Sequence, residues 1–197
     1  SSAASDVYKR QIQEVAKTAK HLTVFQRTPN WCAPLLNRRI EKEEMEQIRA
    51  NYDAMFQRCM ETFSCFLHTP DPRGTFEATP EEREAFWEEL YASPGFGIWL
   101  GNFKDMLTNR AANAEISAFV AKKIRQRVKN QAVAEKLIPK NHGFGTRRVP
   151  METKYYEVYN QDNVELVDIK ETPIERITAT GIRTSDTERD FDMIIYA

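Results

Sequence analysis

A chain of 197 residues is long enough to bury a hydrophobic core, and this length permits one or two domains. Hydrophobic residues make up 41% of the chain and charged residues 29%, which is ordinary for a soluble globular protein. The formal net charge of −1 argues against a nucleic-acid-binding surface, because such a surface needs an excess of basic residues. No apolar run approaches the length that crosses a bilayer, so no membrane association is expected.

Cysteine and histidine are too sparse and too scattered to indicate a special site. Cys32, Cys59 and Cys65 are odd in number and lack CxxC spacing, which indicates reduced thiols in a cytoplasmic protein. The three histidines are far apart in the sequence, so we predict no metal site.

Both ends of the chain differ from a natural domain boundary. The polar stretch SSAASDVYKR at residues 1–10 differs in character from the rest of the chain, and we interpret it as a non-native, adapter-like tail that is left out of the fold prediction. Residues 191–197 have the pattern of a buried strand, and a domain that stops inside such a strand leaves an open edge. We therefore predict an internal fragment of a longer protein.

The first informative stretch is a helix followed by a short strand. Residues 11–20 predict a helix with one apolar face, and residues 22–25 predict a buried strand that Pro29 terminates. Together they match the second half of a βαβ unit. In a dinucleotide-binding fold an acidic residue at this strand tip selects NAD, whereas an arginine accommodates the 2′-phosphate of NADP. Arg27 lies at this tip, and the alternative is a solvated charge at a strand end.

The middle of the chain has a helical pattern for roughly a hundred residues, longer than an ordinary connection. Residues 37–66 predict one amphipathic helix whose apolar face, including Met55, Cys59 and Phe63, belongs to the core. Three further helices are predicted: one begins with a capping box at Thr79, Pro80 and Glu82, a short one covers residues 98–107, and a long one covers residues 113–136. The apolar face of this long helix contains Ile116, Phe119, Val120, Ile124 and Val128. The aromatic stripe near Trp87 belongs to the core or lines a substrate passage.

The second informative stretch is LIPKNHGFGTRRVP at residues 137–150. Its proline and glycines forbid a regular helix, and Phe144 is an apolar anchor. Arg147 and Arg148 come next, and neighbours in an extended chain point to opposite sides, so this pair could serve two ligands. Two surface arginines on a loop are the alternative.

The C-terminal part predicts a short helix and several strands. The helix covers residues 152–159, a strand covers residues 164–167, and residues 174–179 and 181–184 form a hairpin. A final buried strand is predicted at residues 191–197. A strand, a hairpin and a strand that close a parallel sheet fit the end of a nucleotide-binding domain in flavoproteins that bind two dinucleotides.

Four stretches occur in an order typical of one family: IQEVAKTAKHLTVFQRTPNW at 12–31, LIPKNHGFGTRR at 137–148, YYEVYNQDNVELVD at 155–168 and DFDMIIYA at 190–197. With them the chain resembles a Baeyer–Villiger monooxygenase of the cyclohexanone and phenylacetone monooxygenase type, a class B flavoprotein monooxygenase. The resemblance implies an α/β fold, namely a partial Rossmann-type NADPH-binding domain of a two-dinucleotide-binding flavoprotein with an inserted helical subdomain. The boundaries that it implies are 11–31 and 137–197 for the NADPH-binding domain and 32–136 for the helical insertion.

The resemblance also implies an activity and site residues. The family uses NADPH to reduce FAD, and a flavin peroxide formed with O2 then inserts one oxygen atom into a ketone, which gives an ester or a lactone. Arg27 and Thr28 match positions that contact the 2′-phosphate of NADPH, and Arg147 matches a basic position facing that phosphate. Arg148 matches the active-site arginine that stabilises the peroxyflavin and positions the nicotinamide. A fixed guanidinium suits this role because it stays protonated beside a developing negative charge.

The chain departs from the family in its missing glycine motifs. Neither the FAD-binding motif nor the GxGxxG of the NADPH side is present, so most of the FAD site is expected outside this chain and the isolated chain is expected to be inactive. The loop residues Asn141, His142 and Gly143 also differ from those of well-known members. Two other interpretations remain: a flavin monooxygenase that oxygenates nitrogen or sulfur, and a non-catalytic helical and Rossmann remnant acting as an interaction module. The expected partners are a ketone and O2, without nucleic acid or membrane.

Overall fold

The computed structural model describes residues 4–62 and 65–196, with side chains from Lys9 onward. Two compact units divide the chain: unit 1 comprises Ser1–Trp31, Val120–Gly143 and Lys154–Ala197, and unit 2 comprises Cys32–Phe119 and Phe144–Thr153. The domain boundaries expected from the sequence stay a prediction. The predicted core residue Phe63 lies outside the described residues.

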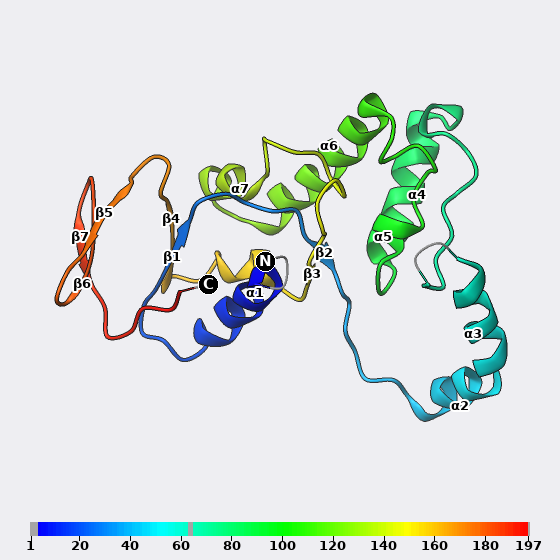
Figure 1. Cartoon of the computed structure of the whole chain (residues 1–197), viewed down its shortest axis with the longest axis horizontal. Coiled ribbons are helices and arrows are strands. Elements are labelled where there is room, and N and C mark those ends of the chain that lie inside the picture. The colour runs from blue at the N-terminus through cyan, green and yellow to red at the C-terminus, as the bar shows by residue number, and fades with distance from the viewer. Residues whose placement is uncertain (1–3, 63–64, 197) are drawn as a thin grey trace. The chain divides into compact units, whose positions relative to one another are not determined.

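Unit 1 contains a pair of parallel strands with a helix before the first of them. Helix α1 spans Ala4–Val15, strand β1 spans Leu22–Gln26 and strand β4 spans Val164–Asp168. β1 and β4 lie side by side, with Leu22 opposite Val164 (Figure 1). Both predicted strands are confirmed, although the β1 side chains are half-buried and not fully buried.

Helix α1 differs from the predicted helix at both ends. It begins within the stretch that was left out of the fold prediction, and it ends at Val15 instead of residue 20. The Asn163 side-chain amide donates to the carbonyl oxygens of Ala16 and Ala19, at 3.0 and 2.9 Å. This amide binds carbonyls that come after the last helical residue, so a residue 147 positions away satisfies backbone groups just beyond the end of the helix.

Unit 1 also contains two short helices and a small antiparallel sheet. Helix α7 spans Gln131–Leu137, and helix α8 spans Tyr155–Val158 and packs against α1. Strands β5 (Ile174–Ile177), β6 (Gly181–Thr184) and β7 (Glu188–Asp190) form the sheet, which confirms the predicted hairpin. Gly181 is required there, because a Cβ at this position would lie 1.9 Å from the carbonyl oxygen of Arg189.

The predicted strand at residues 191–197 is wrong for the part that is described. Residues 191–196 form no strand, and Met193 and Tyr196 are 75% and 79% exposed. A strand needs a neighbouring strand for its backbone hydrogen bonds. Among the described residues β1 and β4 pair only with each other, so residues 191–196 do not join their sheet. Phe191 instead places its ring edge-on against Phe25, with centroids 5.9 Å apart.

An ion pair joins β4 to β7 in unit 1 and gives it a testable pH dependence. Arg189 donates to both carboxylate oxygens of Glu165, at 2.9 and 3.3 Å, and this contact lowers the pKa of Glu165 below its usual value of 4.5. A lowered pKa in the folded state adds stability above the unfolded-state pKa, and this stability is lost as the pH falls through the folded-state pKa. We therefore expect β6 and β7 to open more readily below about pH 4.5.

Hydrogen exchange of the β6 amides, corrected for the intrinsic rate at each pH, measures this opening. Glu165→Gln should raise exchange at neutral pH and weaken the acid-dependent step, because the neutral amide forms no ion pair with Arg189. Exchange that changes with pH equally in the wild type and in Glu165→Gln would contradict the assignment.

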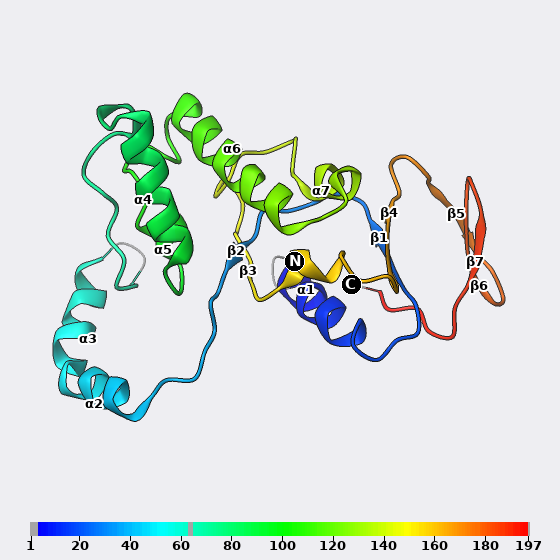
Figure 2. The same ribbon diagram turned by 180° about the vertical axis from the view of Figure 1, so that it is seen from behind.

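Unit 2 is mostly helical. Its helices are α2 (Lys42–Ala50), α3 (Tyr52–Glu61), the 3-10 turn η1 (Thr75–Glu77), α4 (Pro80–Ala92), α5 (Gly97–Leu100) and the first part of α6 (Arg110–Arg127). The short strands β2 (Ala33–Pro34) and β3 (Met151–Glu152) pair in parallel. Figure 2 shows α4 beside α5, and the predicted capping box of α4 is confirmed.

The single helix predicted for residues 37–66 is wrong. α2 and α3 are separate helices that meet at Asn51, and neither has a buried residue. Phe56 and Met60 are 64% and 81% exposed, and Met55 and Cys59 are half-buried, so this face is not core. Helical spacing predicts that one face is apolar, whereas burial requires another element to cover that face.

Two other predicted helices are shorter than expected. The helix predicted for residues 98–107 ends at Leu100, and the buried Asn102 side chain explains this end because it binds the backbone of Ile98 and Phe103. The helix predicted for residues 113–136 is divided into α6 and α7, because Asn130 caps α7 by accepting from two of its amides. The apolar face predicted for the helix at residues 113–136 is confirmed, since its five residues are at most 3% exposed.

The aromatic stripe of α4 is core at its centre. Trp87 is buried, and its ring lies 5.6 Å from that of Phe119 and 6.2 Å from that of Phe103, measured between centroids. Its indole nitrogen donates to Asn102 at 3.0 Å. A satisfied donor and a buried ring favour packing over a substrate passage.

Candidate cofactor-binding and active site

The first part of the candidate site lies at the carboxyl end of β1 in unit 1. Arg27 and Thr28 come directly after Gln26, and Arg27 is exposed while Thr28 is half-buried. Parallel strands end at the same edge of a sheet, and nucleotides bind outside this edge in α/β folds. Within the described part of the chain Arg27 forms no ion pair, so its guanidinium can bind an anion such as a phosphate.

The turn after β1 is held at both ends by side-chain hydrogen bonds. Before the turn, Gln26 donates to the carbonyl oxygen of Lys136 at 2.8 Å. After it, the buried Trp31 donates from its indole nitrogen to the carbonyl oxygen of His142 at 3.0 Å, and the His142 ring lies 3.0 Å from the Asn30 amide oxygen. Residues 27–29 therefore project from a fixed frame.

The sequence reasoning missed His142 as a structural partner of this turn. In the sequence His142 is one of three scattered histidines and part of a loop that departs from the family. The two partners are 112 positions apart, and no local pattern in the sequence indicates such a contact.

The second part of the candidate site is a short exposed loop in unit 2. Thr146, Arg147 and Arg148 are exposed, whereas Phe144 and Val149 on either side are at most 1% exposed. Beyond Val149, the carbonyl oxygen of Pro150 accepts from the amide of Ala33 at 3.1 Å, just where β2 pairs with β3. The arginine pair thus lies between two buried anchors.

Phe144, the first of these anchors, is held through its backbone by helix α6. Its amide donates to the Ser117 hydroxyl at 2.9 Å, and its carbonyl oxygen accepts from the Asn113 side chain at 2.8 Å. The next residue, Gly145, has a φ of +78°, and a Cβ there would lie 3.0 Å from the Trp99 indole. Only glycine fits both this backbone conformation and this approach.

The sequence reasoning also missed Asn113 and Ser117, although a signal existed. Both are polar residues at helical spacing from Ile116 and Val120, within an otherwise apolar stripe of α6. A polar residue on a buried helix face needs a hydrogen-bond partner, and this requirement could have singled them out.

The structure thus groups the four predicted site residues into two pairs. It places Arg27 and Thr28 together in unit 1, and Arg147 and Arg148 together in unit 2. Their roles toward NADPH stay predictions. Three of the four are arginines, whose planar guanidinium binds phosphates well.

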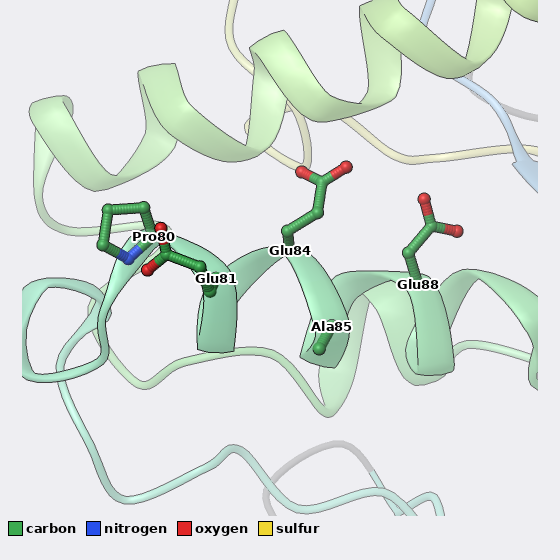
Figure 3. A pocket seen from close by; sticks show the side chains of 5 residues that line it. All are labelled: Pro80, Glu81, Glu84, Ala85 and Glu88. Carbon is green, nitrogen blue, oxygen red and sulfur yellow. The ribbon is translucent and has the colours of Figure 1, made fainter.

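A shallow hollow on α4 has the wrong chemistry for this cofactor. It is lined by Pro80, Glu81, Glu84, Ala85 and Glu88, and Figure 3 shows the Glu84 and Glu88 side chains pointing to the same side of the helix. Carboxylates repel the phosphates of a dinucleotide. We therefore do not assign the cofactor site to this hollow. Among the described residues no group of three or more metal-binding side chains gathers, and no helix is long and apolar enough to cross a membrane.

Comparison with known proteins places these features in a family. The chain is 55% identical over 182 residues to a 2-oxo-Δ3-4,5,5-trimethylcyclopentenylacetyl-CoA monooxygenase of Pseudomonas putida, covering 92% of this chain and 33% of that protein. It is 40% identical to a cyclopentanone 1,2-monooxygenase of a Comamonas species, covering 94% of this chain and 34% of the relative. A crystal structure of OTEMO with FAD and NADP matches with a TM-score of 0.95 at 53% identity, over 98% of this chain and 36% of that one. No protein-family model matches the chain.

These relatives define the class, because the chain is homologous to flavin-dependent monooxygenases that are similar to it over nearly its whole length. More narrowly, its homologues are Baeyer–Villiger monooxygenases, which confirms the resemblance inferred from the four sequence stretches. The predicted α/β fold class is confirmed as well, since the similar structures are FAD- and NADP-bound enzymes of this kind. The chain spans about a third of the length of the curated relatives that it matches.

Proposed function

We propose that this chain is the NADPH-binding part, with its helical insertion, of an FAD- and NADPH-dependent Baeyer–Villiger monooxygenase. Such an enzyme inserts one oxygen atom from O2 into a ketone and gives an ester or a lactone. The observation that supports the proposal most is the placement of Arg27 at the carboxyl end of β1, in a chain whose homologues bind NADP.

The residues at the end of β1 fit the 2′-phosphate of NADPH. The Arg27 guanidinium is exposed and forms no ion pair within the described residues, and the Thr28 hydroxyl comes next in the same turn. A guanidinium donates two parallel hydrogen bonds to a phosphate, and a hydroxyl adds a third donor. In this proposal Arg27 and Thr28 hold the 2′-phosphate, and Arg147 adds a further positive charge.

Arg148 is the residue that we assign to the chemical step. Bound NADPH and FAD would supply the hydride and the activation of O2. The guanidinium of Arg148 presents a fixed positive charge where negative charge develops. Its exposed position on a short loop with two buried anchors suits a side chain that reaches toward a neighbouring part of the enzyme.

FAD itself requires residues that this chain does not supply. The sequence contains no GxGxxG motif, the motif whose glycines precede a helix that cradles a pyrophosphate. We propose that the longer enzyme binds FAD and that the isolated chain is inactive. We also propose a cytoplasmic enzyme, because Cys32, Cys59 and Cys65 form no disulfide with one another in the described part of the chain.

Product analysis of the full-length enzyme tests the proposal. With NADPH, O2 and a cyclic ketone such as cyclopentanone, we expect a lactone whose mass exceeds that of the ketone by one oxygen atom. Incubation with NADH in place of NADPH serves as the control and should give much less product. Oxygenation of thioethers or amines without any ester would favour the nitrogen- and sulfur-oxygenating alternative. A protein that binds NADPH and oxygenates no substrate would favour the interaction module.

A further inference from the structure

Two polar residues of α6, the buried Asn113 and the half-buried Ser117, contact the loop that precedes the arginine pair. We propose that Asn113 and Ser117 are positioning residues that set the place of Arg147 and Arg148 by fixing the backbone of Phe144. This inference rests on the proposed function, because it gives those residues a role in the reaction assigned to Arg148.

The Asn113 and Ser117 side chains both hydrogen-bond to the backbone of Phe144. The Ser117 hydroxyl donates to the carbonyl oxygen of Asn113 at 2.7 Å and accepts from the Phe144 amide at 2.9 Å. The Asn113 amide group donates to the carbonyl oxygens of Phe144 at 2.8 Å and of Met106 at 3.0 Å. Both backbone groups of Phe144 are therefore held by one helix, and its side chain is completely buried.

Burial of this helix face alone would not require polar residues. The positions around them are Ile116, Val120 and Ile124, each at most 1% exposed. An apolar residue in place of Asn113 or Ser117 would bury the face without the desolvation that a polar side chain incurs. The polar pair instead provides direction, because hydrogen bonds hold the Phe144 backbone in one orientation, whereas apolar contact does not.

The held backbone lies close enough to determine where the arginines project. Arg147 comes three residues after Phe144, and Gly145 between them is held against Trp99 in a left-handed conformation. Val149 is buried on the other side, so the exposed residues 146–148 have little freedom at either end. A misplacement of about 1 Å at a catalytic group can reduce the rate by about 100-fold.

Ser117→Ala in the full-length enzyme removes the acceptor of the Phe144 amide and leaves the apolar stripe intact. We expect faster hydrogen exchange in the peptide that covers residues 144–148. We also expect at least a tenfold loss of kcat for ester formation, and weaker NADP+ binding by calorimetry because Arg147 is displaced as well. Ser117→Thr keeps the hydroxyl and should restore all three values.

Asn163→Ala is the matched control. Asn163 also donates its side-chain amide to two backbone carbonyls, those of Ala16 and Ala19, but it lies in unit 1, whereas the arginine loop belongs to unit 2. This control should lower the melting temperature about as much as Asn113→Ala does, while exchange in residues 144–148 and kcat stay as in the wild type. Equal losses of kcat in Asn113→Ala and Asn163→Ala would show that Asn113 only stabilises the fold. That result would overturn the proposal.

Two further results separate this inference from the proposed function. If Arg148→Ala keeps normal ester formation, the role assigned to Arg148 fails, and the exchange measurement still shows whether Ser117 holds the loop. If Arg148→Ala abolishes ester formation and Ser117→Ala leaves kcat and NADP+ binding unchanged, the proposed function stands and the positioning role is overturned.

Discussion

Arg148→Ala in the full-length enzyme is expected to abolish ester formation while the fold stays intact. The side chain is exposed, so its removal leaves no cavity in a core. Loss of one fixed donor that stabilises developing negative charge typically lowers kcat by about 10² to 10³-fold. Product formation by gas chromatography and thermal unfolding of the same preparation measure the two parts of this prediction.

The neighbouring arginine provides a matched control for Arg148. Arg147→Ala removes the same side chain one residue earlier, from the same exposed loop. We expect it to weaken NADPH binding and to retain ester formation at saturating NADPH. Normal product formation by Arg148→Ala would contradict the catalytic assignment, and so would an equal loss of kcat in both variants.

Arg27→Ala is expected to weaken NADPH binding far more than NADH binding. The guanidinium contacts only the 2′-phosphate in this assignment, and NADH lacks that group. A hydrogen bond to a charged group contributes about 1.5 to 3 kcal/mol. Since about 1.4 kcal/mol corresponds to a tenfold change, the preference for NADPH over NADH should fall by about 10- to 100-fold. Kinetics with each cofactor in turn measure this ratio.

The strand hairpin of unit 1 offers a control for the loss of an exposed arginine. Arg176 in β5 is exposed and lies outside the turn after β1, so Arg176→Ala should leave the ratio of the two cofactors unchanged. Arg27→Lys keeps the charge without the planar fork and should fall between the wild type and Arg27→Ala. An unchanged ratio in Arg27→Ala would remove Arg27 from the phosphate site.

Local patterns in the sequence correctly predicted the elements that depend on residues close together in the chain. The strand at Leu22–Gln26, the capping box at Thr79 and the hairpin around Gly181 all depend on residues within a few positions of one another. The irregular loop before Arg147 is of the same kind, because proline and glycine exclude a helix there. The ordered set of four family stretches then identified the class of enzyme and its four candidate site residues.

The ends of helices and the fate of apolar faces depended on distant residues. The helix predicted for residues 11–20 stops at Val15, and Asn163 binds the carbonyls just beyond it. The apolar residues of α3 are exposed or half-buried, although their spacing is as regular as that of the buried residues on α6. Periodicity describes one helix, whereas burial is a property of two elements in contact.

The sequence by itself therefore determined the family, the strand with Arg27 at its tip, and the loop that contains Arg147 and Arg148. Only the tertiary structure decided what holds these residues in place. His142 binds Asn30 from 112 positions away, and Asn113 and Ser117 bind Phe144 from 31 and 27 positions away. Such hydrogen bonds form between residues that folding alone brings within about 3 Å, so no local pattern in the chain predicts them.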